Sequence, residues 1–264
     1  MTTVADIIEH LDTWFPPALA ESWDAIGLVC GRRAQPVKRI VLAVDPTVEV
    51  VQWALTEGAD LLITHHPLYL RGTSTVDGDT PKGDVVHRAI AGGLALFVAH
   101  TNADNARPGV SDALAEAFGI RDALPIEPHP TNPTLGTGRV GTLAEPLTLA
   151  AFAERVAAVL PATATPLRVA GDPTRLVRRA AVCGGAGDSL LPHIDADVYV
   201  TSDLRHHIVS EYLAQGRAAL IDCAHAAAES LWLTPLEHRL RSAVPDVDVM
   251  CCPLNTDPWT AAQA

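Results

Sequence analysis

The sequence has little positive charge, and lysine is especially scarce. Only Lys38 and Lys82 occur among 264 residues, and the 19 basic residues face 31 aspartates and glutamates, for a formal net charge of −12. Nucleic-acid binding depends on cations that neutralise phosphates, so this balance argues against a nucleic-acid partner. An acidic chain does suit a site that concentrates cations, although the charge alone specifies no partner.

The sequence also lacks a cysteine framework. Its five cysteines are an odd number without a CxxC pair, which argues against a set of disulfides and against a Cys-rich zinc site. Cys183 lies in an apolar run and is expected to be a small core residue rather than a nucleophile.

Signals for export and for membrane insertion are missing as well. The segment 1–6 has neither a basic region nor a long apolar stretch, so no signal peptide is predicted. No apolar run approaches the length of a membrane span. We expect a protein of the reducing cytoplasm with no membrane association.

Strand-like and helix-like segments alternate along the chain, which predicts an α/β fold with largely parallel sheets. A stretch rich in proline, threonine and asparagine at 125–137 resembles a connection, so we expect an N-terminal lobe at 1–124 and a C-terminal lobe at 125–264. The segments 59–64 and 196–201 are similar, which favours two related lobes, although chance similarity between two buried strands is an alternative.

Periodicity and capping signals locate the elements. Helices are expected at 4–14 (capped by Thr3 and Asp6), 48–57, 84–91, 111–118 (capped by Ser111), 149–160, 204–214, and from Ala226 to a break at Pro235. Buried strands are expected at 39–45, 60–64, 94–99, 167–170, 179–183, 197–201 and 218–222.

The strand predicted at 60–64 ends directly on two histidines, His65 and His66. The carboxyl ends of parallel strands are where α/β proteins place their ligands. Neutral imidazole is the commonest side-chain ligand of transition metals. Since successive strand side chains point in different directions, adjacent histidines suit contact with two ions better than chelation of one.

Other strand ends carry similar residues. Six of the 11 histidines follow predicted strands, namely His65, His66, His100, His206, His207 and His225. Glu229 follows His225 by four residues, so the two share one helical face. This clustering predicts a metal site, and imidazole and carboxylate without thiolate favour zinc, iron, manganese, cobalt or nickel.

Five ordered motifs resemble the dinuclear-metal-centre (NIF3-like) family, also called the GTP cyclohydrolase 1 type 2 homologs; they lie at 21–28, 63–67, 100–104, 201–207 and 222–229. The resemblance implies two α/β lobes with the metal site between them, and a toroidal homohexamer. It also implies two divalent ions per subunit. His65 and Asp104 would then serve one ion, His66 and His225 the other, and Glu229 would bridge both.

The sequence departs from the family at Ser202 and Ala224, where glycine is usual, but no ligand is lost. Asp203 is the best candidate for a catalytic proton acceptor, with His206 beside it, although Asp203 is equally expected to cap a helix at Leu204. The glycine-rich segment 184–187 fits a tight turn better than a phosphate-binding loop.

Two divalent ions would make hydroxide available at neutral pH and polarise a substrate oxygen. The leading hypothesis is therefore a metal-dependent hydrolase of a small molecule, for which the family name implies a nucleotide. The alternative is a non-catalytic metal-binding protein, a metal chaperone or a regulatory scaffold. A plain nucleotide-binding module would leave the histidines unexplained.

Overall fold

A computed structural model describes residues 1–262, which form two compact α/β units. Unit 1 consists of Met1–Ala106 and Leu233–Thr256, and unit 2 consists of Arg107–Trp232 with residues 257–262. The predicted α/β class with two lobes is confirmed. The units differ in their bounds from the expected lobes, 1–124 and 125–264, because the chain returns to unit 1 after residue 232 to add a helix and a strand.

Unit 1 contains a five-stranded sheet in the order β1-β4-β3-β2-β13. Four strands run parallel, and only β1 pairs antiparallel, with β4. The register aligns Ala43 with Thr64 and Thr64 with Val98, so β2, β3 and β4 end at one edge of the sheet. The strands are β1 (Gly27–Cys30), β2 (Arg39–Ala43), β3 (Leu61–Thr64), β4 (Ala95–Val98) and β13 (Asp248–Cys251).

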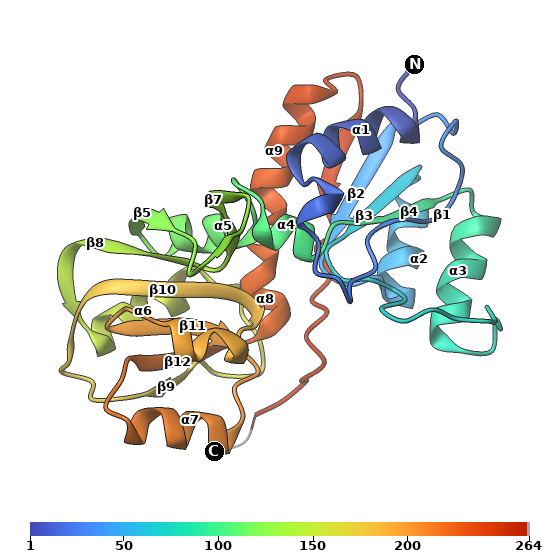
Figure 1. Ribbon diagram of the computed structural model, residues 1–264. Helices are drawn as coiled ribbons and strands as arrows, with labels where there is room; N and C mark the ends of the chain where they lie inside the picture. Colours follow the sequence, from blue (N-terminus) through green and yellow to red (C-terminus); the bar gives the residue numbers. More distant parts are fainter. Residues whose placement is uncertain (263–264) are drawn as a thin grey trace. The chain divides into compact units, whose positions relative to one another are not determined.

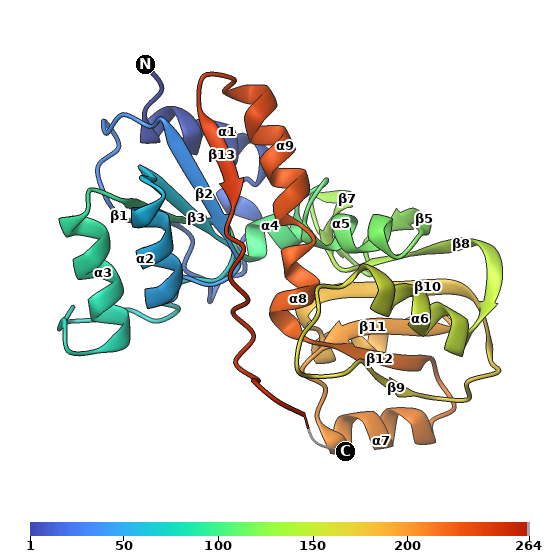
Figure 2. The ribbon, with the colours of Figure 1, turned by 180° about the vertical axis from the view of Figure 1, so that it is seen from behind.

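Helices cover both faces of this sheet. Helices α1 (Val4–Trp14) and α9 (Leu233–Ala243) lie on one face, and α2 (Val48–Thr56) and α3 (Pro81–Ala91) lie on the other (Figures 1 and 2). The sheet face toward α2 and α3 is apolar. Alternate residues of the strands contribute to it, because successive side chains of a pleated strand point to opposite faces. Helix α1 begins with the predicted capping box, in which Thr3 and Asp6 bond each other's backbone N–H groups.

Unit 2 contains a six-stranded sheet in the order β5-β8-β10-β11-β12-β9. The central strands β10, β11 and β12 are parallel, and the flanking strands pair antiparallel. The stretch predicted as a connection holds a hairpin of β6 (Glu127–His129) and β7 (Asn132–Thr137). The sheet strands are β5 (Ile120–Leu124), β8 (Arg139–Thr148), β9 (Arg168–Ala170), β10 (Leu176–Ala186), β11 (Val198–Ser202) and β12 (Ala219–Cys223).

The helices of unit 2 pack onto its central strands. Helices α5 (Val110–Ala117), α6 (Leu149–Val159) and α8 (His225–Ser230) contact β10. Helix α7 (His206–Ala214) contributes Tyr212 to an apolar cluster with Tyr199 of β11. No helix among the described residues combines the length and the apolar character needed to cross a membrane.

Several predicted helix boundaries were wrong, among them the start of the helix expected at 84–91, which begins at Pro81 behind the N-cap Thr80. Ser111 lies inside α5, whose N-cap is Gly109, because the Asp112 carboxylate accepts the Gly109 N–H at 2.9 Å. Helix α7 starts at His206 rather than at Leu204, because Arg205 has an extended backbone (φ −87°, ψ 151°) and is the N-cap residue. The last helical stretch is divided into α8 and α9 before Pro235 is reached, and the proline sits in the first turn of α9, where its missing N–H costs nothing.

Candidate metal centre

His65 and His66 follow β3 without a break in the ladder. The backbone N–H of His65 donates to the Ala43 carbonyl at 3.2 Å, and that of His66 donates to the Val44 carbonyl at 2.8 Å. The His65 side chain is fully buried, whereas that of His66 is 21% exposed. Their ring centroids are 5.2 Å apart. The ladder therefore holds two imidazoles in fixed, different environments at the end of one strand.

Both rings are oriented through their Nδ1 atoms. His65 Nδ1 lies 3.0 Å from the Ala99 carbonyl oxygen, and His66 Nδ1 lies 2.7 Å from Asp45 Oδ1. A carbonyl and an ionised carboxylate only accept, so each Nδ1 must carry the proton. The lone pair of each ring is then on Nε2, which is the arrangement of metal-ligating histidines with an oxygen acceptor behind them.

A short helix brings a carboxylate to the same place. Helix α4 (Thr101–Asn105) starts directly after β4 and carries Asp104, whose Oδ1 is 3.7 Å from His65 Nε2. Asn102 is buried and anchors this turn. Its amide donates to the Phe15 carbonyl at 2.8 Å, and its Oδ1 accepts the His100 N–H at 3.0 Å.

His100 is the third imidazole of unit 1. One coordinating atom from each of His65, His66 and His100 lies within 4.8 Å of the others. The His100 ring is 5.1 Å from that of His65 and 5.7 Å from that of His66. A cluster of three imidazoles and one carboxylate is a donor set that suits zinc and its neighbours in the transition series.

Unit 2 carries an imidazole–carboxylate pair of its own on α8. His225 Nε2 lies 3.1 Å from Glu229 Oε1, as their spacing of four residues predicted. The Glu229 side chain is only 3% exposed. His225 Nδ1 lies 2.7 Å from Asp203 Oδ2, so this ring, like those of unit 1, has an oxygen acceptor behind Nδ1 and presents Nε2 on its other side.

The glycine-rich segment after β10 is a tight turn tied down by side chains. The Thr201 hydroxyl donates to the Gly185 carbonyl and accepts the Gly187 N–H, each at 2.9 Å, and the Tyr199 hydroxyl donates to the Gly187 carbonyl. The segment brings Gly185 against α8. A Cβ at Gly185 would lie 2.8 Å from Glu229 Oε1 and 3.2 Å from His225 Nε2.

Comparison with known proteins identifies the group to which these motifs belong. Residues 2–258 match the family described as Duf34/NIF3 (NGG1p interacting factor 3). The chain belongs to this family. The resemblance seen in the sequence motifs is thus confirmed over nearly the whole chain.

Relatives within the Duf34/NIF3 family are similar in both sequence and structure. A "GTP cyclohydrolase 1 type 2 homolog" of Streptomyces coelicolor is 49% identical, with 99% of this chain and 95% of the relative covered. "NIF3-like protein 1" of Drosophila melanogaster is 31% identical, with 86% and 77% covered. The solved structure of a Bacillus cereus protein related to NIF3 has a TM-score of 0.91 at 25% identity, with 99% of each chain covered.

The two residues predicted as catalytic lie in different surroundings. Asp203 does not cap α7, and its carboxylate is engaged with His225 Nδ1. His206 lies exposed in the first turn of α7, with its ring 5.2 Å from that of His207. In this member of the Duf34/NIF3 family, Asp203 thus orients a candidate ligand, and His206 faces solvent.

The two departures from the family's usual glycines are accommodated without strain. Ser202 ends β11 in extended conformation and is fully buried, and Ala224 has a φ of −63°. Both conformations are open to any residue. Neither position therefore needs glycine in this chain.

Two carboxylates of the site had no role assigned from the sequence. Asp24 and Asp45 accept hydrogen bonds from His100 and His66, respectively. A signal for Asp45 was present, because it follows the strand adjacent to the one that leads into His66. Asp24 lies in the loop before β1 and not at the carboxyl end of a strand, and only its place in a family motif marked it.

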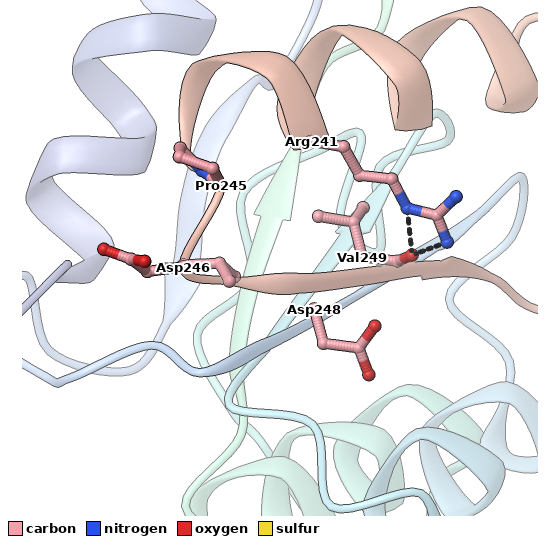
Figure 3. A pocket seen from close by; sticks show the side chains of 6 residues that line it. Arg241, Pro245, Asp246, Asp248 and Val249 are labelled. Carbon is pink, nitrogen blue, oxygen red and sulfur yellow. Dashed lines mark hydrogen bonds between the residues drawn. The ribbon is translucent and has the colours of Figure 1, made fainter.

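Unit 1 also has a pocket at the opposite edge of its sheet (Figure 3). The pocket lies where α9 leads into β13, and the Arg241 guanidinium beside it donates to the Val249 carbonyl at 2.7 and 3.1 Å. Asp248 pairs with Arg39 at the amino ends of β13 and β2. The pocket is therefore remote from the histidines, which follow the carboxyl end of β3.

Replacing Gly185 with alanine is expected to weaken metal binding by about tenfold, since the new methyl group would displace the Glu229 carboxylate. The φ of 66° adds backbone strain of about 1 kcal/mol. Gly216→Ala is the matched control, because Gly216 has a φ of 67° and a Cβ there would meet nothing within 4 Å. Cobalt titration and urea unfolding of both variants separate the two effects. Equal cobalt affinity in the two variants would contradict the expected displacement.

Proposed function

We propose that the protein binds two divalent ions through His65, His66, Asp104, His225 and Glu229. The carrying observation is that each of the three histidines of this set has an oxygen acceptor behind Nδ1, which leaves Nε2 as the atom that would coordinate a metal. In the proposed assignment His65 and Asp104 serve one ion, His66 and His225 serve the other, and Glu229 bridges. Nitrogen and oxygen donors without thiolate favour zinc, iron, manganese, cobalt or nickel.

We further propose that the protein is a hydrolase of a small molecule. Two bound ions supply Lewis acidity and a low pKa for water. The chain's own residues hold the ligands in place: Asp45 orients His66, Asp203 orients His225, and the Ala99 carbonyl orients His65. A nucleotide is the first substrate class to test, because several relatives carry the name GTP cyclohydrolase 1 type 2 homolog.

The test is a substrate screen with the protein loaded with each of the five metals in turn. Nucleotides, phosphoesters and cyclic amides are the compounds to screen. We expect turnover that requires the metal and is lost in both His65→Ala and Glu229→Ala. Turnover that survives in both variants would refute a metal-dependent hydrolase.

A non-catalytic role in metal binding, metal delivery or regulation is the second candidate. It is favoured by the surroundings of the predicted catalytic residues, since Asp203 is engaged with His225 and His206 is exposed. This role predicts tight, stoichiometric metal binding and no turnover with any compound of the screen.

We also propose that the chain assembles as a homohexamer and works in the cytoplasm without nucleic acid. The support for the hexamer is the family resemblance alone. Sedimentation velocity at several concentrations tests it, and a monomer would refute the hexamer for this chain.

A further inference from the structure

His100 stands outside the five proposed ligands, yet unit 1 places it as part of the same cluster. It is the N-cap residue of α4, directly after β4, and its side chain is 15% exposed. Its ring approaches both His65 and His66 nearly edge-on, at interplanar angles of 65° and 79°. One coordinating atom of each of the three rings lies within 4.8 Å of the others, so an ion held by His65 is within reach of His100.

Asp24 fixes the orientation of this ring. His100 Nδ1 lies 2.8 Å from Asp24 Oδ1, so it donates to the carboxylate and Nε2 carries the lone pair. Oδ1 also accepts the Ala25 N–H at 2.7 Å, and Oδ2 accepts the N–H and the hydroxyl of Thr101. The His100 ring is therefore held from behind by a carboxylate that is itself held by three further donors.

The Asp24 carboxylate is held in a fixed position. Its side chain is fully buried, and an isolated buried charge would be costly. The hydrogen bonds from His100, Ala25 and Thr101 offset that cost and leave one oxygen in place behind His100 Nδ1.

We propose that His100 is a further imidazole ligand of the ion that His65 and Asp104 serve, and that Asp24 is its positioning residue. This inference rests on the proposed metal centre, but not on catalysis. It gives that ion two imidazoles and the Asp104 carboxylate from unit 1. Such a nitrogen-rich set is expected to prefer zinc and cobalt to manganese and magnesium.

The test is cobalt titration of the full-length apo-protein, followed by calorimetry and by visible absorption. We expect His100→Ala to lower the binding affinity for one of the two ions by at least about a hundredfold and to change the visible spectrum, while the other ion is retained. Asp24→Asn should lower the affinity for the same ion by about ten- to a hundredfold. His87→Ala is the control, because His87 is exposed on α3 and its ring bonds the Val76 carbonyl instead.

X-ray absorption of the zinc-loaded wild-type protein gives a readout that does not depend on a variant's folding. The inference predicts four imidazoles shared by two ions, whereas the five-ligand set predicts three. Three imidazoles, or a cobalt spectrum and affinity in His100→Ala equal to those of His87→Ala, would overturn it. Wild-type protein without turnover but with His100-dependent cobalt binding would refute the hydrolase and keep the inference. A His100→Ala variant that loses turnover but binds cobalt as the wild type does would refute the inference and keep the hydrolase.

Discussion

A Glu229→Gln variant is expected to lose one of the two ions and to bind the other at least about a hundredfold more weakly. In the proposed centre this carboxylate contacts both ions, and an amide supplies no negative charge and a poorer oxygen donor. The carboxylate is 3% exposed and lies 3.1 Å from His225 Nε2, so water has little room to take its place. Metal analysis after dialysis and calorimetric titration measure both effects.

Glu211→Gln is the matched control, since Glu211 is exposed on α7. Thermal unfolding adds a second measurement, because a ligand that binds only the folded state stabilises it by about 2.7 kcal/mol at a hundredfold excess over its Kd. A chelator should thus lower the Tm of the wild type and of Glu211→Gln, but change that of Glu229→Gln much less. Two tightly bound ions in Glu229→Gln would contradict its place as a bridging ligand.

The parts of the site that the sequence predicts are those fixed by local structure. The apolar run 61–64, bounded by Gly58 and Pro67, predicts a buried strand, and the residues that follow a strand of a parallel sheet lie at the sheet edge. The pair His225 and Glu229 is equally local, because a helix sets the position of a residue four places on. These features needed no knowledge of the rest of the fold.

The acceptors behind the histidines could not be predicted in the same way. Asp24 and His100 are 76 positions apart, and Asp203 and His225 are 22 apart, so tertiary packing alone brings each pair together. Asp203 shows the consequence. Its position before a helix suggested a cap, but a left-handed backbone turns the carboxylate to the imidazole instead.

The bounds of the two units could not be predicted from the sequence for a similar reason. Strand β13 follows a helix in the last part of the chain, and its pairing with β2 joins residues about 210 positions apart, such as Asp248 and Arg39. No local pattern specifies a partner at that distance. Composition at 125–137 suggested a connection between lobes, whereas the chain forms a hairpin there.

Replacing Asp112 with asparagine is expected to destabilise unit 2 by about 3–5 kcal/mol, because it leaves a buried guanidinium without its counter-charge. Arg139 at the start of β8 is fully buried, and its Nε and Nη2 each donate to the Asp112 carboxylate at 2.7 Å. Its Nη1 donates to the Gly136 and Gly138 carbonyls, also at 2.7 Å. The ion pair therefore ties α5 to the turn that leads into β8.

Urea unfolding of the metal-free protein, followed in single and double variants, measures this effect. Asp195→Asn is the control, because Asp195 pairs with Arg179 in the same unit but is 95% exposed, and its loss should barely move the urea midpoint. The double variant Asp112→Asn with Arg139→Met removes both charges together. It should lose less stability than the two single changes added, since no buried charge is left without a partner. A midpoint for Asp112→Asn equal to that of Asp195→Asn would show that the buried pair contributes no more than an exposed one.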